Sequence, residues 1–137
     1  TIAYFCAKFI TMNVPSDLRY TADHEWVKID GDIATVGVTD FAQGELGDIV
    51  FVEVETEGEE LEAEEVFGTI EAVKTVSDLF LPLAGKVIAF NEALDDAPAL
   101  INSDPFGDGW IIKLKMSNVA DFESLMDADA YKNTIGK

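Results

Sequence analysis

The chain has 137 residues, a length typical of one domain with a sizeable core, and 48% of its residues are hydrophobic. Nine basic and 27 acidic residues give a net charge of −18, which disfavours nucleic acid and anionic membranes as partners because like charges repel. With one cysteine, Cys6, and one histidine, His24, the composition excludes a disulfide framework and argues against a metal site. We therefore expect an acidic monomer without metal.

The first residues form an apolar stretch that is too short to cross a membrane, since a span needs about 20 residues. It lacks the basic leader of a signal peptide and the arginines of a transit peptide. We interpret residues 1–11 as an appended or upstream extension and residues 12–137 as a single domain. The predicted location is the bacterial cytoplasm, with the mitochondrial matrix as the alternative.

Short strands dominate the first half of the chain. Residues 26–29 and 33–39 are strand-like, and Asp30-Gly31 between them is a strong hairpin signal. Ala34, Val36 and Val38 alternate with polar or small residues and predict one buried face. Residues 40–47 predict one or two helical turns, with Asp40 as the N-terminal cap and Gly47 at the end.

The middle of the chain continues this pattern. Residues 49–55 predict a strand rich in β-branched and aromatic side chains. Eight of the thirteen residues in 53–65 are glutamate, which indicates a solvated turn and a charged edge strand. Strands are expected at 66–72, 76–81 and 86–90, followed by a turn-rich segment at 91–109.

The last part combines one more strand with helices. Residues 110–116 alternate, with Ile112, Leu114 and Met116 expected to point inward. The tail predicts one helix capped by Ser117 or Asn118 and a second at 129–135. Many short strands at close spacing favour an antiparallel sandwich or a partly open barrel.

Lys74 stands alone between the two apolar strands at 66–72 and 76–81. The pattern predicts a hairpin with this lysine at its tip, and we expect Gly68, Pro82 and Gly85 to supply the corners at which the chain turns back. An amine displayed in this way is accessible for covalent modification, although an ordinary exposed turn lysine fits the spacing equally well.

The sequence around Lys74 resembles the lipoyl-lysine hairpin of the glycine cleavage system H protein family. The similar segment is Glu71-Ala72-Val73-Lys74-Thr75-Val76-Ser77-Asp78, with Gly68 and Gly85 in register. Further segments resemble the family in the same order from Met12 onward: 24–26, 37–40, 46–52, 102–110 and 127–131. Biotin carriers usually place methionine on both sides of the lysine, so Val73 and Thr75 argue against biotin.

The resemblance implies a mainly β fold, a lipoyl/biotinyl-like barrel-sandwich hybrid of antiparallel sheets with a short internal helix and C-terminal helices. It also implies a non-catalytic carrier for glycine catabolism and one-carbon metabolism, with lipoic acid amide-linked to Lys74. The expected partners are a pyridoxal-phosphate glycine decarboxylase, a tetrahydrofolate-dependent aminomethyltransferase, an FAD-dependent dihydrolipoyl dehydrogenase, and a lipoate ligase or lipoyl/octanoyl transferase. Glu71 is either recognised by the ligase that attaches the lipoyl group or simply an exposed residue.

In this family the loaded arm folds back into a cleft on the carrier. By motif position the docking residues are Glu25 and Asp78, with His24 and Asp23 as further candidates. Each of them is alternatively an ordinary surface residue. Phe41 and Glu45 stand where family members often carry histidine in the short helix, and Thr75 follows the lysine where alanine is frequent; these differences bear on how the arm docks.

Two alternatives to an aminomethyl carrier remain. One is a relay protein that passes lipoyl or octanoyl groups to 2-oxoacid dehydrogenases, with the same fold and the same lysine. The other is an acidic binding module that uses the scaffold for protein contacts alone. The sequence shows no calcium loop, hydrolytic triad or phosphate-binding glycine loop that would indicate a different function.

Overall fold

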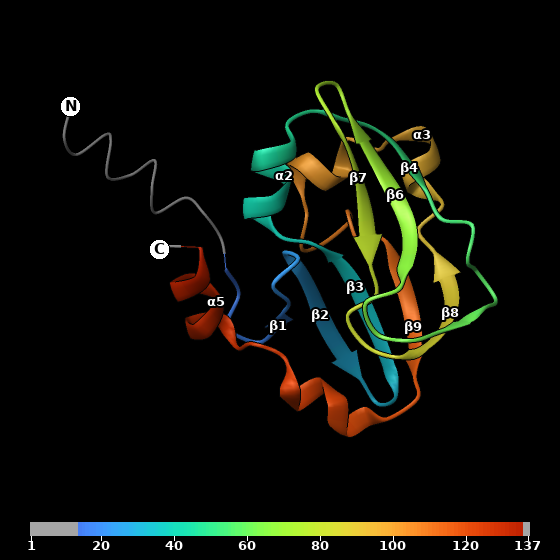
Figure 1. The fold of residues 1–137 in the computed structure, drawn as a ribbon. Helices are drawn as coiled ribbons and strands as arrows, with labels where there is room; N and C mark the ends of the chain where they lie inside the picture. Colours follow the sequence, from blue (N-terminus) through green and yellow to red (C-terminus); the bar gives the residue numbers. More distant parts are fainter. Residues whose placement is uncertain (1–13, 136–137) are drawn as a thin grey trace.

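The structure, a computed structural model, describes residues 14–135, so the predicted extension at residues 1–11 lies outside the described residues. The chain forms two antiparallel sheets that face each other (Figure 1). The larger sheet has the strand order β1-β2-β3-β9-β8-β5, and the smaller has the order β4-β6-β7. The strands are β1 (Arg19–Tyr20), β2 (Glu25–Asp30), β3 (Ile33–Val38), β4 (Ile49–Glu53), β5 (Glu60–Leu61), β6 (Val66–Ala72), β7 (Val76–Phe80), β8 (Gly85–Phe90) and β9 (Ile112–Met116).

Short helices connect and flank these sheets. They are α2 (Asp40–Leu46), α3 (Ala93–Asp96), α4 (Leu100–Ser103), the 3₁₀ helix η1 (Val119–Ser124) and α5 (Ala128–Thr134). The prediction of a mainly β fold with antiparallel sheets, a short internal helix and C-terminal helices is confirmed. No described helix is long and apolar enough to cross a membrane.

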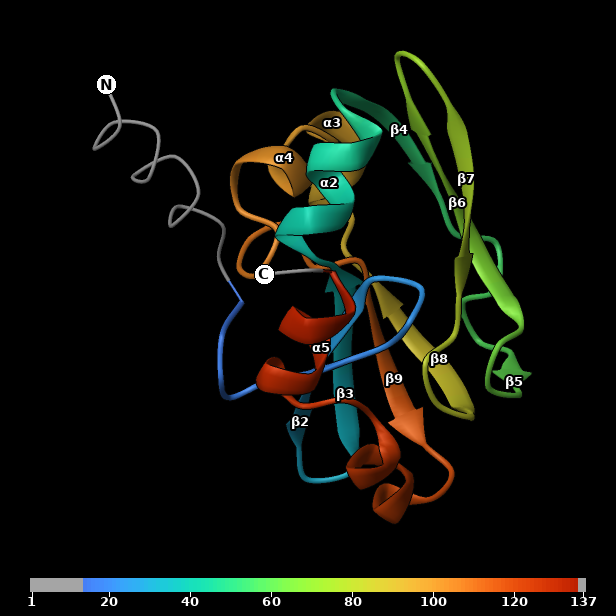
Figure 2. The same cartoon turned by 60° about the vertical axis from the view of Figure 1, so that its left-hand side comes forward.

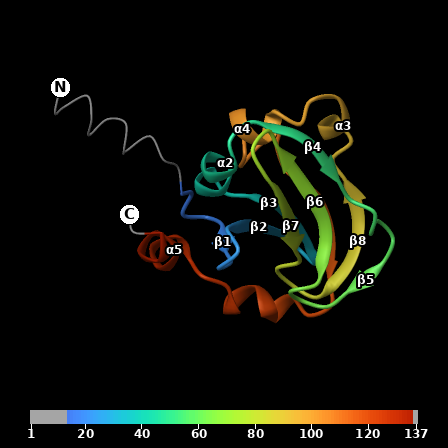
Figure 3. The same ribbon diagram turned by 45° about the horizontal axis from the view of Figure 1, so that its top comes forward.

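The main core lies between the two sheets, which appear as separate layers in Figures 2 and 3. The predicted inward residues Ala34, Val36 and Val38 of β3 are buried there, together with Leu114 of β9. Across the gap, Ile70 and its neighbours on the smaller sheet complete the same cluster. The alternation of apolar and polar residues therefore predicted the buried face correctly.

A second, smaller core holds the C-terminal helix against the large sheet. Tyr131 of α5 stacks on Tyr20 of β1 with ring centroids 4.7 Å apart. Trp26 is buried beside them, and its indole Nε1–H donates to the carbonyl of Pro105 at 2.8 Å. The aromatic ring covers Gly37, where a side chain would approach the indole to 2.6 Å. This cluster ties the end of the chain to its first strands.

Several local predictions need correction. The side chain of Thr39, not Asp40, caps α2, because its hydroxyl accepts a hydrogen bond from the backbone of Ala42 at 3.1 Å. The turn-rich segment 91–109 contains the two short helices α3 and α4, each only four residues long. The first tail helix is a 3₁₀ helix, which Asn118 caps as one of the two predicted residues. β1 had no signal in the sequence, and β4 and β9 are shorter than predicted.

Candidate functional site

The hairpin of β6 and β7 projects beyond the rest of the molecule and carries Lys74 at its tip (Figure 1). The strands pair up to Glu71 and Val76, and the backbone N–H of Ala72 donates to the carbonyl of Thr75 at 2.8 Å. Val73, Lys74 and Thr75 form the turn and are all exposed, with 75% of Val73 accessible. The amine is therefore displayed on a firm two-stranded support, as the sequence predicted.

The tip rests on the loop that connects α2 to β4. The backbone N–H of Val73 donates to the carbonyl of Asp48 at 2.9 Å. Lys74 lies across Gly47, so that a Cβ at this glycine would be 3.3 Å from Lys74 Cε. Gly47 has φ +83° and ψ −155°, a conformation that is essentially restricted to glycine. The end of the lysine side chain therefore lies beside the C-terminal end of α2.

A cleft of about 230 Å³ opens between α2, β2 and β7, close to this end of the helix. Apolar side chains of Val38, Leu46, Ile70 and Leu79 line it, together with Phe41 and Ala42. The polar side chains at its surface are those of Asp23, His24, Glu25, Glu45, Ser77 and Asp78. All four predicted docking residues therefore line one cleft, although they come from two distant segments of the chain.

Glu25 is the buried acid of this cleft. Only 3% of the residue is exposed, and its carboxyl accepts a hydrogen bond from the backbone N–H of Phe80 at 2.9 Å. Its other oxygen lies 3.3 Å from the hydroxyl of Thr21. Burial raises the pKa of Glu25 to about 8, with a smaller contribution from the nearby charge of Asp23, against the lowering effect of the Phe80 hydrogen bond. The carboxyl is therefore mainly protonated at neutral pH.

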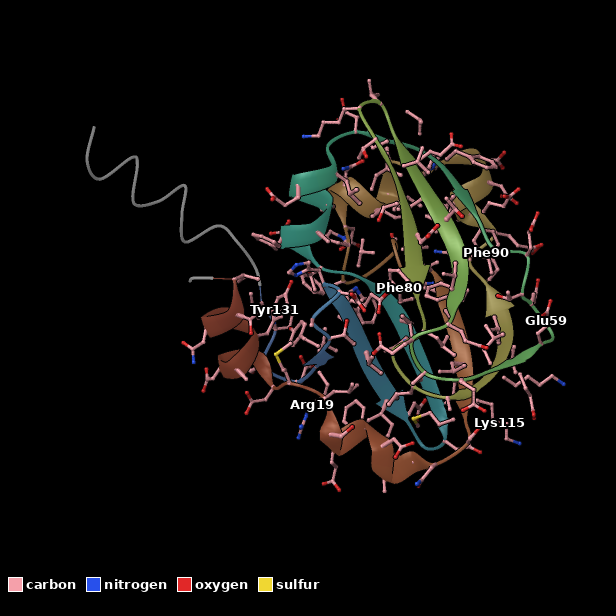
Figure 4. The ribbon with its side chains drawn as sticks, in the orientation of Figure 1. Arg19, Glu59, Phe80, Phe90, Lys115 and Tyr131 are labelled. Carbon is pink, nitrogen blue, oxygen red and sulfur yellow. The ribbon has the colours of Figure 1, made fainter. Side chains whose placement is uncertain are left out.

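His24 lies at the junction of the cleft with α5. Its Nδ1 is 2.9 Å from the hydroxyl of Tyr131, which is in turn 2.7 Å from the hydroxyl of Thr39. Its ring also packs against Phe41, with centroids 4.9 Å apart. Figure 4 shows Tyr131 pointing from α5 toward the body of the molecule. Burial lowers the pKa of His24, while the charges of Asp23 and Glu45 oppose this effect.

The remaining predicted residues are exposed or close-packed. Asp23, Asp78 and Glu71 are exposed, and Glu71 lies on the outer face of the hairpin opposite Val76. Gly68 and Gly85 do not form corners, because both lie in strands and neither has a positive φ. A side chain at Gly68 would meet the carbonyl of Glu53 at 2.6 Å, and one at Gly85 would collide with the carbonyl of Lys115. Both glycines are needed for close packing of neighbouring strands.

Sequence reasoning missed part of this site. Ala42 and Leu46 line the cleft at helical spacing beside Phe41 and Glu45, which the sequence analysis had already linked to arm docking, so this pattern was available in the sequence. The roles of Thr21, Thr39 and Tyr131 depend on contacts that no local pattern indicates. Among residues 14–135, no group of three or more His, Cys, Asp or Glu residues is arranged to hold a metal ion.

Comparison with known proteins gives consistent matches. The profile of the family described as Glycine cleavage H-protein matches residues 18–137. The glycine cleavage system H protein of Bacteroides fragilis is 58% identical over 124 residues, covering 90% of this chain and 98% of that protein. The protein of the same name from Chlorobium phaeobacteroides is 58% identical over 127 residues, covering 91% and 99%.

A solved structure agrees in fold. The crystal structure of a glycine cleavage system H protein from Mycobacterium marinum matches with a TM-score of 0.82 and 40% sequence identity. The match covers 90% of this chain and 100% of that chain.

Proposed function

This chain belongs to the glycine cleavage H-protein family, the non-enzymatic lipoyl carriers of the glycine cleavage system, and on that premise we propose that Lys74 carries the lipoyl group in amide linkage. The observation that supports this assignment best is the position of Lys74. It is exposed at the tip of a projecting hairpin, yet the end of its side chain lies against Gly47, directly after the helix α2 that lines the cleft with the buried carboxyl of Glu25. An ordinary surface lysine has no need of both features.

When bound, the lipoyl group supplies a dithiolane that can accept an aminomethyl group and two electrons. The lysine with its octanoyl chain reaches roughly 14 Å by bond geometry, which is enough for the end of the arm to enter a cleft that starts at the neighbouring helix. The residues around the cleft fit such a group, because an apolar lining suits an aliphatic chain and carboxyl groups suit a protonated amine.

Each docking residue then has a defined role. Glu25 would hold a basic amine carried on the arm: its proton would pass to the neutral amine, and the resulting carboxylate and ammonium would compensate each other's desolvation. Asp78 adds a second carboxylate at the surface of the cleft, and Asp23 and His24 line the same cleft. Val38, Leu46 and Ile70 keep water away from the arm.

The partners of this carrier belong to the glycine cleavage system. We assign glycine decarboxylase, the aminomethyltransferase and dihydrolipoyl dehydrogenase as the enzymes that Lys74 serves in turn, and a lipoate ligase or lipoyl/octanoyl transferase as the enzyme that modifies it. Tethering raises the effective concentration of the carried group at each of their sites. The proposed carrier domain spans residues 12–137. Its relatives reported above are bacterial, and the cytoplasmic location stays a prediction.

Modification by a purified lipoate ligase tests the attachment site. The full chain is incubated with ligase, lipoate and ATP, and its intact mass is measured together with that of the Lys74→Arg and Lys86→Arg variants. We expect one lipoyl addition on the wild type and on Lys86→Arg, and none on Lys74→Arg. Lys86 is an exposed strand lysine and serves as the matched control.

Reconstitution with the three partner enzymes then tests the carrier role. Lipoylated wild type should support glycine decarboxylation with reoxidation of the dithiol, whereas Lys74→Arg should support neither. Lipoylation of Lys74 without any glycine cleavage, combined with transfer of the lipoyl group to a 2-oxoacid dehydrogenase domain, would favour the relay role instead.

A further inference from the structure

Asn102 in α4 holds the loop on which the lysine hairpin rests. Its side-chain Nδ2 donates to the carbonyl of Gly47 at 2.9 Å and to the side-chain oxygen of Gln43 at 3.0 Å. Its Oδ1 accepts a hydrogen bond from the backbone N–H of Ile49 at 2.9 Å. Since Ile49 N–H can only donate and the Gly47 carbonyl can only accept, these two partners fix the orientation of the amide.

The residue between these two contacts holds the hairpin tip. The carbonyl of Asp48 accepts the hydrogen bond from Val73, the residue directly before the lysine. Lys74 itself lies against Gly47. The register of β4 with β6 reaches Ile49 opposite Ala72, and an irregularity follows directly after Ile49. Loop 47–49 is therefore in contact with the tip through a backbone hydrogen bond and through the lysine side chain.

We propose that Asn102 is a positioning residue for Lys74, which acts by fixing loop 47–49 and so sets the direction in which the hairpin presents the amine. Asn102 acts through Asp48 and Val73 and has no role in the chemistry of the amine. This role rests on the proposed attachment of the lipoyl group to Lys74. It explains why an asparagine is required, because the site calls for two donors and one acceptor in one plane. An aspartate of the same shape would set a carboxylate against two oxygen acceptors.

Asn91 provides a matched control within the same chain. Its Nδ2 donates to the carbonyls of Asp108 and Trp110, each at 2.8 Å, and its Oδ1 lies 3.3 Å from the backbone nitrogen of Ala93. Like Asn102, this side chain donates to two oxygen atoms and accepts from one backbone N–H, and it is buried. Its partners belong to segments 91–93 and 108–110 and not to the hairpin or to loop 47–49. Asn91→Asp therefore introduces the same chemical change without altering the contacts of Asn102, loop 47–49 or the hairpin tip.

The first measurement is amide hydrogen exchange in the unmodified full chain. We expect Asn102→Asp to raise the exchange rate of the Val73 amide about 10-fold or more. Loss of the hydrogen bonds of the neutral Asn102 amide should lower the free energy of opening the tip by at least about 1.4 kcal/mol, which corresponds to that factor. The Ala72 amide, which bonds within the hairpin to Thr75, should change less. Asn91→Asp should leave the exchange of Val73 at the wild-type rate.

The second measurement is the steady-state kinetics of lipoylation, with the carrier as the varied substrate at a temperature where every variant is folded. Asn102→Asp should lower kcat by about 10-fold with a smaller effect on KM, because a displaced amine reacts slowly even when the carrier is bound. Asn91→Asp should keep the wild-type kcat. If Asn102→Asp does not fold, Asn102→Ala removes the same hydrogen bonds without adding a charge, and the same result is expected.

Two results would overturn this role. One is wild-type exchange at Val73 and wild-type kcat in a folded Asn102 variant. The other is an equal loss of kcat in Asn91→Asp, which would show a general effect of stability. A wild-type chain that no ligase modifies at Lys74 would instead overturn the proposed attachment, and the exchange rate of Val73 would still report whether Asn102 holds the tip.

Discussion

Glu25→Gln should make the protein more stable at alkaline pH, because the folded protein holds this carboxyl in its protonated form. The carboxyl is buried beneath the cleft, and its pKa is raised from an ordinary value of 4.5 to about 8. In the unfolded chain it releases its proton near pH 4.5. Its contribution to folding is therefore fully present below that pH and is lost as the pH rises through about 8.

The size of this loss follows from the two pKa values. Integration of the proton linkage between about pH 5 and pH 9 gives a loss on the order of 4 kcal/mol from this one group. Glutamine has the shape of the protonated acid, and its oxygen can accept the hydrogen bond that Phe80 N–H donates at 2.9 Å. The variant should therefore escape this loss while it retains the contact.

Urea unfolding at a series of pH values measures this difference directly. The free energy of unfolding of the wild type should fall more steeply between about pH 5 and pH 9 than that of Glu25→Gln, with a gap of several kcal/mol at the alkaline end. Glu60→Gln makes the same chemical change on an exposed edge strand and serves as the control. Parallel curves for the wild type and Glu25→Gln would refute the reasoning, since they would mean that the buried group titrates alike in both states.

Three further substitutions test the packing of the strands and the His24 contacts. Gly85→Ala should destabilise the protein by about 1–3 kcal/mol, because the new methyl group collides with the carbonyl of Lys115. Gly44→Ala in α2, where nothing lies within 4 Å of the new atom, should instead raise the melting temperature through better helix propensity. Destabilisation by both substitutions would contradict the packing argument. Tyr131→Phe should cost about 1–3 kcal/mol and alter the tautomer of His24, because His24 Nδ1 loses its partner at 2.9 Å. Long-range ¹H–¹⁵N spectra report this for the one histidine of the chain, and an unchanged ring spectrum would argue against the contact.

Local patterns in the sequence were sufficient for the hairpins. Asp30-Gly31 marked the β2–β3 turn, where Gly31 has φ +66°, and two apolar strands around one lysine marked the β6–β7 tip. These features depend on residues close together in the chain, so that turn chemistry and alternation carry most of the information. The four predicted docking residues lie together as expected, although that grouping came from family resemblance.

What the sequence did not reveal depends on distant contacts. Gly68 and Gly85 were expected at corners where the chain turns back. In the structure they instead let backbone segments from elsewhere in the chain approach closely. The helices α3 and α4 are too short to show a helical period. Asn102 reads as one polar residue in a turn-rich segment, and its role becomes visible only when α4 is placed beside α2 and β4.

The contact between Asn102 and Ile49 joins residues 53 positions apart, and this separation has a consequence for the order of events during synthesis. The β6–β7 hairpin is local and complete once residue 80 has left the ribosome, whereas the hydrogen bonds from Asn102 that fix loop 47–49 can form only after α4 has been synthesised. A growing chain therefore exposes Lys74 before the fold can orient it. If orientation limits the rate of modification as proposed, the modifying enzyme distinguishes finished carriers from unfinished ones, without any dedicated signal for completeness.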